Sequence, residues 1–266
     1  MNPFRSSLSG GLPTVVKNLL IINVLLYLAK MALGSDSHGQ NLLDTHLGMY
    51  YFTSPNFRPW QVITHMFMHG DFMHLLVNMF GLYMFGAPIE QLWGSQRFLK
   101  YYLLCGLGAA ALHTAVNSVE IRQDTEQVAA YGVDVDLVRS TADRINYPLD
   151  DAFPILEDEV RRTGAPEDAV AQLYFDHYGT MLGASGAIFG ILLAFGMFFP
   201  NVELIMIFLP IPIKAKYFVV LYGLFELFSG LRGAQGDNVA HFAHLGGMIF
   251  GYFLIRHWRK KGTTFY

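Results

Sequence analysis

The stretch Gly183-Ala184-Ser185-Gly186-Ala187-Ile188-Phe189-Gly190 opens one long apolar run of the chain. A second apolar run opens on Ala240-His241-Phe242-Ala243-His244-Leu245-Gly246-Gly247. Each run therefore begins with a side chain able to take part in catalysis, in a segment with the composition of a membrane helix. Polar and ionisable groups at membrane depth are costly, so Ser185 and His244 are candidate functional residues.

The composition around these two stretches is that of a membrane protein. Of the 266 residues, 53% are hydrophobic and only 15% are charged, and the mean hydropathy is +0.32. Apolar runs of the kind that cross a hydrocarbon core of about 30 Å occur at 15–34, 72–92, 97–116, 183–200, 215–230 and 239–256. We therefore predict an all-α membrane protein whose core is a bundle of six transmembrane helices.

Basic residues orient this predicted bundle. They lie at Arg5, Lys17, Arg97, Lys100, Lys214, Lys216, Arg256, Arg259, Lys260 and Lys261. With six spans these positions share one side of the membrane, which we predict to be cytoplasmic. The stretch 117–179 falls on the opposite side and carries 14 Asp/Glu against 5 Lys/Arg. We expect a multi-pass protein of a bacterial cytoplasmic membrane with both termini in the cytoplasm.

Composition also divides the chain into regions. We predict a polar N-terminal tail at 1–13, a membrane domain at 14–116 and 180–257, an acidic extramembrane insertion at 117–179, and a cytoplasmic tail at 258–266. Residues 35–71 are rich in aromatic side chains, which favours a loop in the membrane interface. Within the insertion, Pro166 followed by Glu167 and Asp168 predicts the start of a helix, so the insertion is expected to be helical.

A further polar cluster lies at the start of the second apolar run. His74 and Asn78 are four residues apart and share one face of a helix. They enter the membrane from the same side as Ser185 and His244. A serine is a weak nucleophile until a nearby base takes its proton, and an acyl-transfer intermediate needs donors for its oxyanion. These residues therefore predict peptide-bond hydrolysis, with His74, Asn78 and the backbone N–H of Ser185 as oxyanion donors.

Small residues and one aromatic ring support this geometry. The pairs Gly186/Gly190 and Gly247/Gly251 allow two helices to approach closely, as a direct Ser–His hydrogen bond requires. Phe189 lies one turn beyond Ser185 on the same face, where it can pack flat on the His244 ring.

Four motifs stand in order between residues 60 and 256. They are His65-x-x-x-His69-x-x-x-x-His74-x-x-x-Asn78, Glu90-x-x-x-Gly94, Gly183-Ala184-Ser185-Gly186 and Ala243-His244-Leu245-Gly246-Gly247. In this arrangement the chain resembles the rhomboid intramembrane serine proteases. The resemblance implies Ser185 as nucleophile, His244 as general base, His74 and Asn78 as oxyanion contributors, and a dyad without an acidic third member. It also implies single-span membrane proteins as substrates, cut near the non-cytoplasmic surface.

The chain departs from the family pattern in three places. The outer loop reads Trp60-Gln61, with Arg58 nearby, where the family often has Trp-Arg. Phe189 stands where a tyrosine often stacks on the catalytic histidine. The insertion before the fourth run is longer than in compact members of the family.

Other functions were weighed on the same residues. His65, His69 and His241 are interpreted as structural hydrogen-bond partners. The histidines at positions 65, 69, 74, 241 and 244 also resemble the boxes of a di-iron membrane oxygenase, and a non-catalytic rhomboid relative that binds transmembrane helices is a second alternative. The single cysteine, Cys105, excludes an intrachain disulfide and a cysteine-based metal site. The chain shows no basic stripe, P-loop or dinucleotide fingerprint, so neither nucleic acid nor a metal or other cofactor is expected.

Overall fold

The computed structural model of the chain describes residues 11–35, 41–143, 149–206, 209–232 and 240–260. Most of the two predicted tails, including Arg5 and Lys261, lies outside these residues. The described chain is helical, as predicted, apart from two short antiparallel strands, β1 (Glu203–Met206) and β2 (Leu209–Lys214), which the sequence did not predict. The chain divides into two compact units, one built from 1–26, 69–113 and 183–266 and the other from 27–68 and 114–182.

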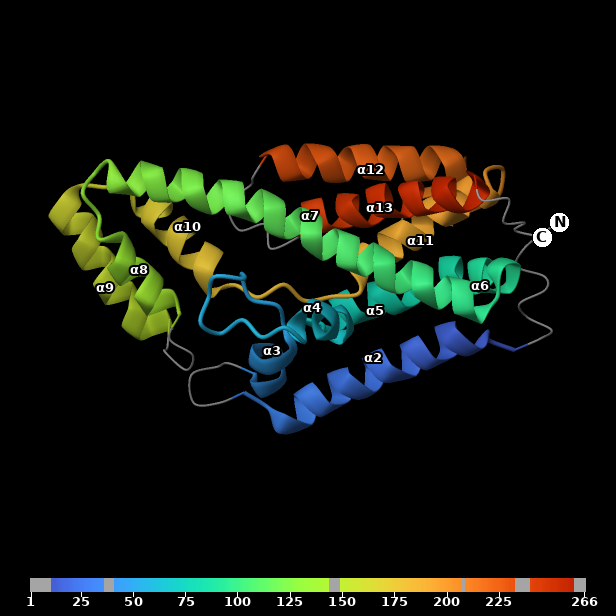
Figure 1. Cartoon of the computed structure of the whole chain (residues 1–266), viewed down its shortest axis with the longest axis horizontal. Coiled ribbons are helices and arrows are strands. Elements are labelled where there is room, and N and C mark those ends of the chain that lie inside the picture. The colour runs from blue at the N-terminus through green and yellow to red at the C-terminus, as the bar shows by residue number, and fades with distance from the viewer. Residues whose placement is uncertain (1–10, 36–40, 144–148, 207–208, 233–239, 261–266) are drawn as a thin grey trace. The chain divides into compact units, whose positions relative to one another are not determined.

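Each predicted apolar run corresponds to helical structure (Figure 1). The elements are α2 (Thr14–Leu33), α5 (Phe72–Gly81) continued by the π-helical turn η2 (Leu82–Gly86) and α6 (Ala87–Trp93), α7 (Ser95–Ala129), α11 (Ser185–Phe198), α12 (Ala215–Arg232) and α13 (His241–Lys260). Among the described helices, Thr14–Leu33, Phe72–Trp93 and Ser95–Ala129 are long and apolar enough to cross a membrane by themselves, and Ser185–Phe198 is a shorter apolar helix. The fold is that of an all-α membrane protein.

Within the first unit, α11 packs most extensively against α13. A Cβ added to Gly247 would collide with the backbone carbonyl of Gly186, and one added to Gly190 would lie 3.0 Å from the carbonyl oxygen of Gly247. The predicted close approach of these two helices is therefore confirmed. Gly251 instead faces α7, where an added Cβ would lie 3.3 Å from the sulfur of Cys105.

Glu90 joins three helices at the other end of this unit. Its carboxylate accepts hydrogen bonds from the backbone N–H groups of Val15 (2.9 Å) and Val16 (2.7 Å) and from the hydroxyl of Ser95 (2.6 Å). A carboxylate at this position satisfies amides of the first turn of α2 that have no partner within the helix. One buried acid thus connects α6 to the starts of α2 and α7.

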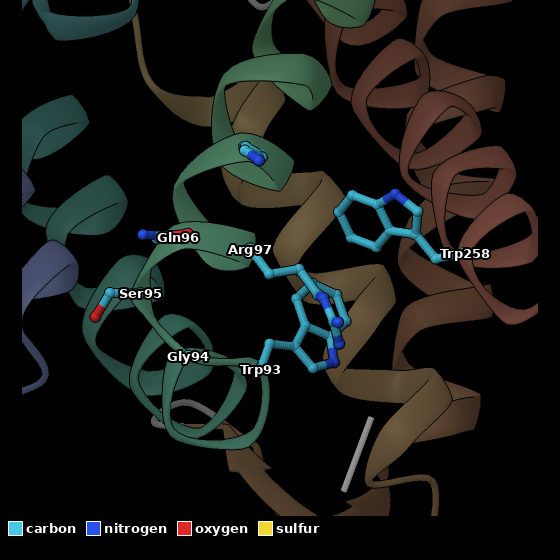
Figure 2. Close-up of a pocket in the computed structure, with 7 residues that line it drawn as sticks. Trp93, Gly94, Ser95, Gln96, Arg97 and Trp258 are labelled. Carbon is cyan, nitrogen blue, oxygen red and sulfur yellow. The ribbon is translucent and has the colours of Figure 1, made fainter. Parts of the chain in front are cut away.

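A pocket of about 510 Å³ lies between Trp93, Arg97 and Trp258, at the same end of the unit as Glu90 (Figure 2). The Arg97 guanidinium carbon lies 6.0 Å from the ring centroid of Trp258. Trp258 is 14 residues beyond His244 on the same helix, which places it roughly 21 Å away along the helix axis. The pocket therefore takes no part in the Ser–His site.

The second unit contains the acidic insertion. Its helices are α3 (Leu42–Leu47), α4 (Gln61–Thr64) followed by the 3₁₀ turn η1 (His65–Phe67), the end of α7, α8 (Val135–Ala142), α9 (Leu149–Thr163) and α10 (Glu167–Tyr178). Helix α7 continues to Ala129, well past the predicted end of its run at 116. Helix α10 begins directly after Pro166, as predicted. Val128, Val138 and Tyr174 are among the fully buried residues that form a core of its own.

The loop before α5 is held by polar contacts within the second unit. Gln61, which is fully buried, accepts a hydrogen bond from the backbone N–H of Arg58 (2.9 Å) and donates from its amide to the carbonyl of Asn56 (3.3 Å). The indole N–H of Trp60 donates to the carbonyl of His46 (3.1 Å). The Gln61 amide thus fixes the loop at the position where the family often has an arginine.

Candidate active site

Ser185 is the first residue of α11, and the backbone before it determines how its side chain is presented. Gly183 has φ +127°, a conformation that other residues rarely adopt. A Cβ at this position would also lie 2.8 Å from Nε2 of His74. Both the backbone angle and the space therefore require glycine two residues before the serine.

His244 faces Ser185 from α13. Its Nε2 lies 2.9 Å from the Ser185 hydroxyl oxygen, although the residues are 59 apart in sequence. This distance is within the range in which a general base takes a proton. The close packing of α13 on α11 at Gly247 makes the contact possible, because a side chain there would collide with the Gly186 backbone and push the two helices apart.

Phe189 fixes the plane of the histidine ring. Its ring stacks on the His244 imidazole with centroids 4.1 Å apart and planes 6° apart. The other neighbour of Phe189 is Tyr222 of α12, with centroids 5.0 Å apart. The stacking expected from the sequence is therefore present, with phenylalanine in place of tyrosine.

A buried carboxylate outside the predicted motifs contacts the far side of His244. Oε2 of Glu226 lies 2.9 Å from Nδ1 of His244 and 2.6 Å from Nδ1 of His241. Glu226 comes from α12 and is only 2% exposed. The resemblance implied a dyad without an acidic member, whereas here a Glu–His–Ser series lies within hydrogen-bonding distance. A lone acid inside the apolar run 215–230 was the signal that could have revealed it.

Two donors lie on α5 beside the serine. Asp71 caps this helix by accepting from the backbone N–H of His74 (2.8 Å). The position that a Cβ of Gly183 would occupy lies 2.8 Å from His74 Nε2 and 3.6 Å from the Ser185 hydroxyl oxygen, so both groups border the same small space. Asn78, one turn further on, is 5% exposed, and its amide nitrogen has no hydrogen-bond partner among the described residues. A buried donor without a partner is suited to a charge that appears only during a reaction.

The remaining predicted histidines lie in packing positions. The His69 ring meets the His74 ring edge to face, with centroids 5.0 Å apart. His65 lies in the second unit, where its Nδ1 is 2.8 Å from the carbonyl of Gln61. His241 shares the Glu226 carboxylate with His244.

Metal-ligating side chains gather at one place in the described part of the chain. Glu226, His241 and His244 offer ligand atoms within 4.8 Å of one another. Two imidazoles and a carboxylate form a donor set that suits zinc. His65, His69 and His74 do not belong to this group, and His244 also faces Ser185. The geometry therefore assembles a nucleophile and base more completely than the boxes of a di-iron centre.

Comparison with known proteins agrees with the motifs. The model of the Rhomboid domain matches residues 56–122 and 167–260. The chain is 40% identical over 53 residues to RHOMBOID-like protein 6, mitochondrial, of Arabidopsis thaliana, which covers 20% of this chain and 17% of that protein. It is 27% identical over 189 residues to RHOMBOID-like protein 12, mitochondrial, of the same plant, covering 70% of this chain and 42% of the relative. It is 26% identical over 115 residues to Rhomboid protease AarA of Providencia stuartii, covering 41% of each.

Each of these alignments spans less than half of the relative's own length. The domain match, in contrast, covers more than half of this chain and includes all the helices that carry the site residues. Together with the apolar helices, it establishes a multi-pass membrane protein. The chain belongs to the rhomboid family.

Proposed function

We propose that the protein is an intramembrane serine endopeptidase. The observation that carries this proposal is the 2.9 Å contact between the Ser185 hydroxyl and Nε2 of His244. Ser185 attacks the peptide carbonyl while its proton moves to His244, and an acyl-enzyme forms when His244 returns that proton to the leaving amine. Water activated by the same histidine then releases the acid product. His74, Asn78 and the backbone N–H of Ser185 stabilise the oxyanion in both steps.

The substrates that fit this site are single-span membrane proteins. A helix in lipid satisfies its backbone groups internally, so a peptide bond must leave the helix before it can be cut. Small residues near the end of the span unwind at lower cost and fit beside the close-packed glycines. We expect cleavage after a small residue near the non-cytoplasmic surface, and mass spectrometry of the products locates the cut. Cleavage at the cytoplasmic end would show the orientation to be inverted.

The basic residues around α7, α12 and α13 support this orientation. Arg97, Lys214 and Arg256 all lie at helix ends away from the starts of α11 and α13, where Ser185 and His244 lie. We propose a bacterial cytoplasmic membrane, with the site opening to the non-cytoplasmic side. Protease-accessibility mapping of tagged termini in spheroplasts tests this placement, and termini digested from outside would contradict it.

The test of the activity is labelling with a fluorophosphonate probe in detergent. The parent protein is expected to be labelled on Ser185 and to cleave a reconstituted transmembrane substrate, and Ser185→Ala to do neither. Ser118→Ala is a matched control, since the Ser118 hydroxyl donates to the carbonyl of Thr114 within α7. Labelling of the Ser185→Ala protein, or its continued cleavage of the substrate, would overturn the proposal.

The two alternatives give different results in the same preparation. A non-catalytic rhomboid relative would bind transmembrane helices but leave Ser185 unlabelled. A di-iron oxygenase would contain close to two iron atoms per chain on metal analysis. We expect labelling without stoichiometric iron.

A further inference from the structure

We propose that Glu226 is a positioning residue, which holds His244 in the tautomer that accepts the Ser185 proton. This inference rests on the proposed protease function. It converts the expected Ser–His dyad into a series of three groups, with Ser185 on α11, His244 on α13 and Glu226 on α12. Each helix of this part of the unit thus contributes one member.

The hydrogen bonds of His244 run in a defined direction. A neutral imidazole carries a single N–H, and an ionised carboxylate can only accept. Because Glu226 Oε2 lies 2.9 Å from Nδ1 of His244, the proton belongs on Nδ1. Nε2 is then left with its lone pair, 2.9 Å from the Ser185 hydroxyl. The carboxylate therefore selects the form of His244 that can act as a base.

The Glu226 carboxylate is buried, unlike most side chains of α12. Helix α12 exposes the apolar side chains that suit lipid contact, which include Val220, Leu221, Leu224, Phe225 and Phe228. Glu226 is 2% exposed on the same helix. Burying a charge is costly unless it is paired and hydrogen-bonded. The partners that compensate for this cost are the two imidazoles, and one of them is the proposed base.

His241 contacts the same carboxylate as His244. Its Nδ1 lies 2.6 Å from the same oxygen, Oε2, that contacts His244. Two donors on one oxygen fix where the carboxylate lies, so His241 supports Glu226. The histidine one turn before His244 thus acts through the shared carboxylate.

The consequence for the reaction is confined to proton transfer. When Ser185 gives its proton to Nε2, His244 carries a proton on both nitrogens and a positive charge. The Glu226 carboxylate stabilises that charge without taking the proton, and Nε2 passes its proton to the leaving amine. Loss of the carboxylate should therefore lower kcat and leave KM nearly unchanged.

Glu226→Gln is the decisive substitution, because its amide can donate to Nδ1 and so favour the wrong tautomer. We expect kcat for a reconstituted substrate to fall by about 10²–10⁴-fold, with KM within about threefold of the parent; the upper figure is that of the equivalent acid-to-amide change in a soluble serine protease. Glu226→Asp keeps a carboxylate and should recover at least about tenfold of the loss. Equal rates for parent and Glu226→Gln would overturn the inference.

His241→Asn is the matched control, since it removes the other partner of the carboxylate. It should lower kcat by less than about tenfold if Glu226 acts through His244. A loss equal to that of Glu226→Gln would mean that the carboxylate only holds His241 in place, and would refute the positioning role.

A spectroscopic measurement separates this inference from the proposed function. In ¹⁵N-histidine-labelled Ser185→Ala protein in detergent, NMR should show the His244 proton on Nδ1, and on Nε2 after the further change Glu226→Gln. A proton on Nε2 of the otherwise unchanged protein overturns the inference, even if Glu226→Gln does not fold. Failure of the parent to cleave or react with the probe would instead overturn the protease function and leave the tautomer result standing. Stoichiometric zinc in the active preparation, bound by Glu226, would contradict the positioning role.

Discussion

The buried acids of the first unit contrast with the exposed ion pairs of the second. In the first unit two carboxylates, those of Glu90 and Glu226, are buried, and each lies within hydrogen-bonding distance of several donors. In the second unit ion pairs such as Arg122–Glu126 and Arg161–Glu157 lie on exposed helix faces. Exposed pairs contribute about 0–1 kcal/mol each, whereas an isolated buried charge costs far more. A buried carboxylate in the first unit therefore indicates a structural or catalytic role, whereas the exposed ion pairs of the second unit indicate only contact with water.

The largest expected effect is that of His244→Ala. Cleavage should fall to the detection limit, as we also expect for Ser185→Ala, because a nucleophile and its base act as one unit. Arg161→Ala in the second unit removes an exposed charge and should leave cleavage within about twofold. Turnover of a reconstituted transmembrane substrate measures both. If His244→Ala retained activity while His241→Ala abolished it, the roles of the two histidines would have to be exchanged.

The next effect concerns the donors on α5. His74→Ala and Asn78→Ala should each lower kcat by about 10²–10³-fold, the usual result of removing one oxyanion donor. The Asn78 amide nitrogen has no partner among the residues described, so its removal breaks no hydrogen bond of the resting protein there. Thermal unfolding in detergent should therefore change little for Asn78→Ala. An effect on KM alone would assign these residues to substrate contact.

A change that loosens the contact between α11 and α13 should have a smaller effect, and it should lower stability as well as activity. Gly247→Ala places a methyl group against the Gly186 carbonyl, which neither backbone can avoid without moving α11 from α13. We expect a loss of about 1–3 kcal/mol in unfolding free energy, the usual cost of overpacking, and a clear fall in cleavage. Gly223→Ala is the control, since its Cβ would meet the flexible end of Met248 at 3.3 Å. Equal stability of the two variants would show that the close approach is not needed.

The sequence predicted those features that local patterns encode. The apolar runs gave the helices, and the Gly-Ala-Ser-Gly and Ala-His motifs gave Ser185 and His244. The partnership of Glu226 with His244 could not be read in this way, because it depends on the rotation of α12 against α13. The true end of α7 was missed because hydropathy falls after 116 while the helix runs on to Ala129, shortly before Gly132 with φ +80°. The strands were missed because Pro210 and Pro212 argue against a strand except at an edge.

The smallest effect concerns Asp176, an acid of the second unit that is not simply solvated. Burial, a hydrogen bond shared with Asp124 and the nearby Glu120 raise the pKa of Asp176 on α10 to about 7. The unfolded chain gives up this proton near pH 3.8, so between about pH 4 and pH 7 the folded state binds more protons than the unfolded state. This acid therefore lowers stability as the pH rises through that window.

Asp176→Asn removes the titration while keeping an acceptor for Gln172, whose amide donates to Asp176 at 2.8 Å. We expect the variant to be more stable than the parent at pH 8 by up to about 4 kcal/mol, seen as a higher Tm, with little difference at pH 4. Asp158→Asn is the control, because its side chain is 80% exposed and its change should leave the pH dependence of unfolding as it is. Thermal unfolding of the full chain in detergent from pH 4 to 8 measures all three proteins. If Asp176→Asn followed the parent across this range, Asp176 would be as well solvated as the exposed acids of the insertion, and it would belong with the exposed ion pairs rather than with the buried acids of the first unit.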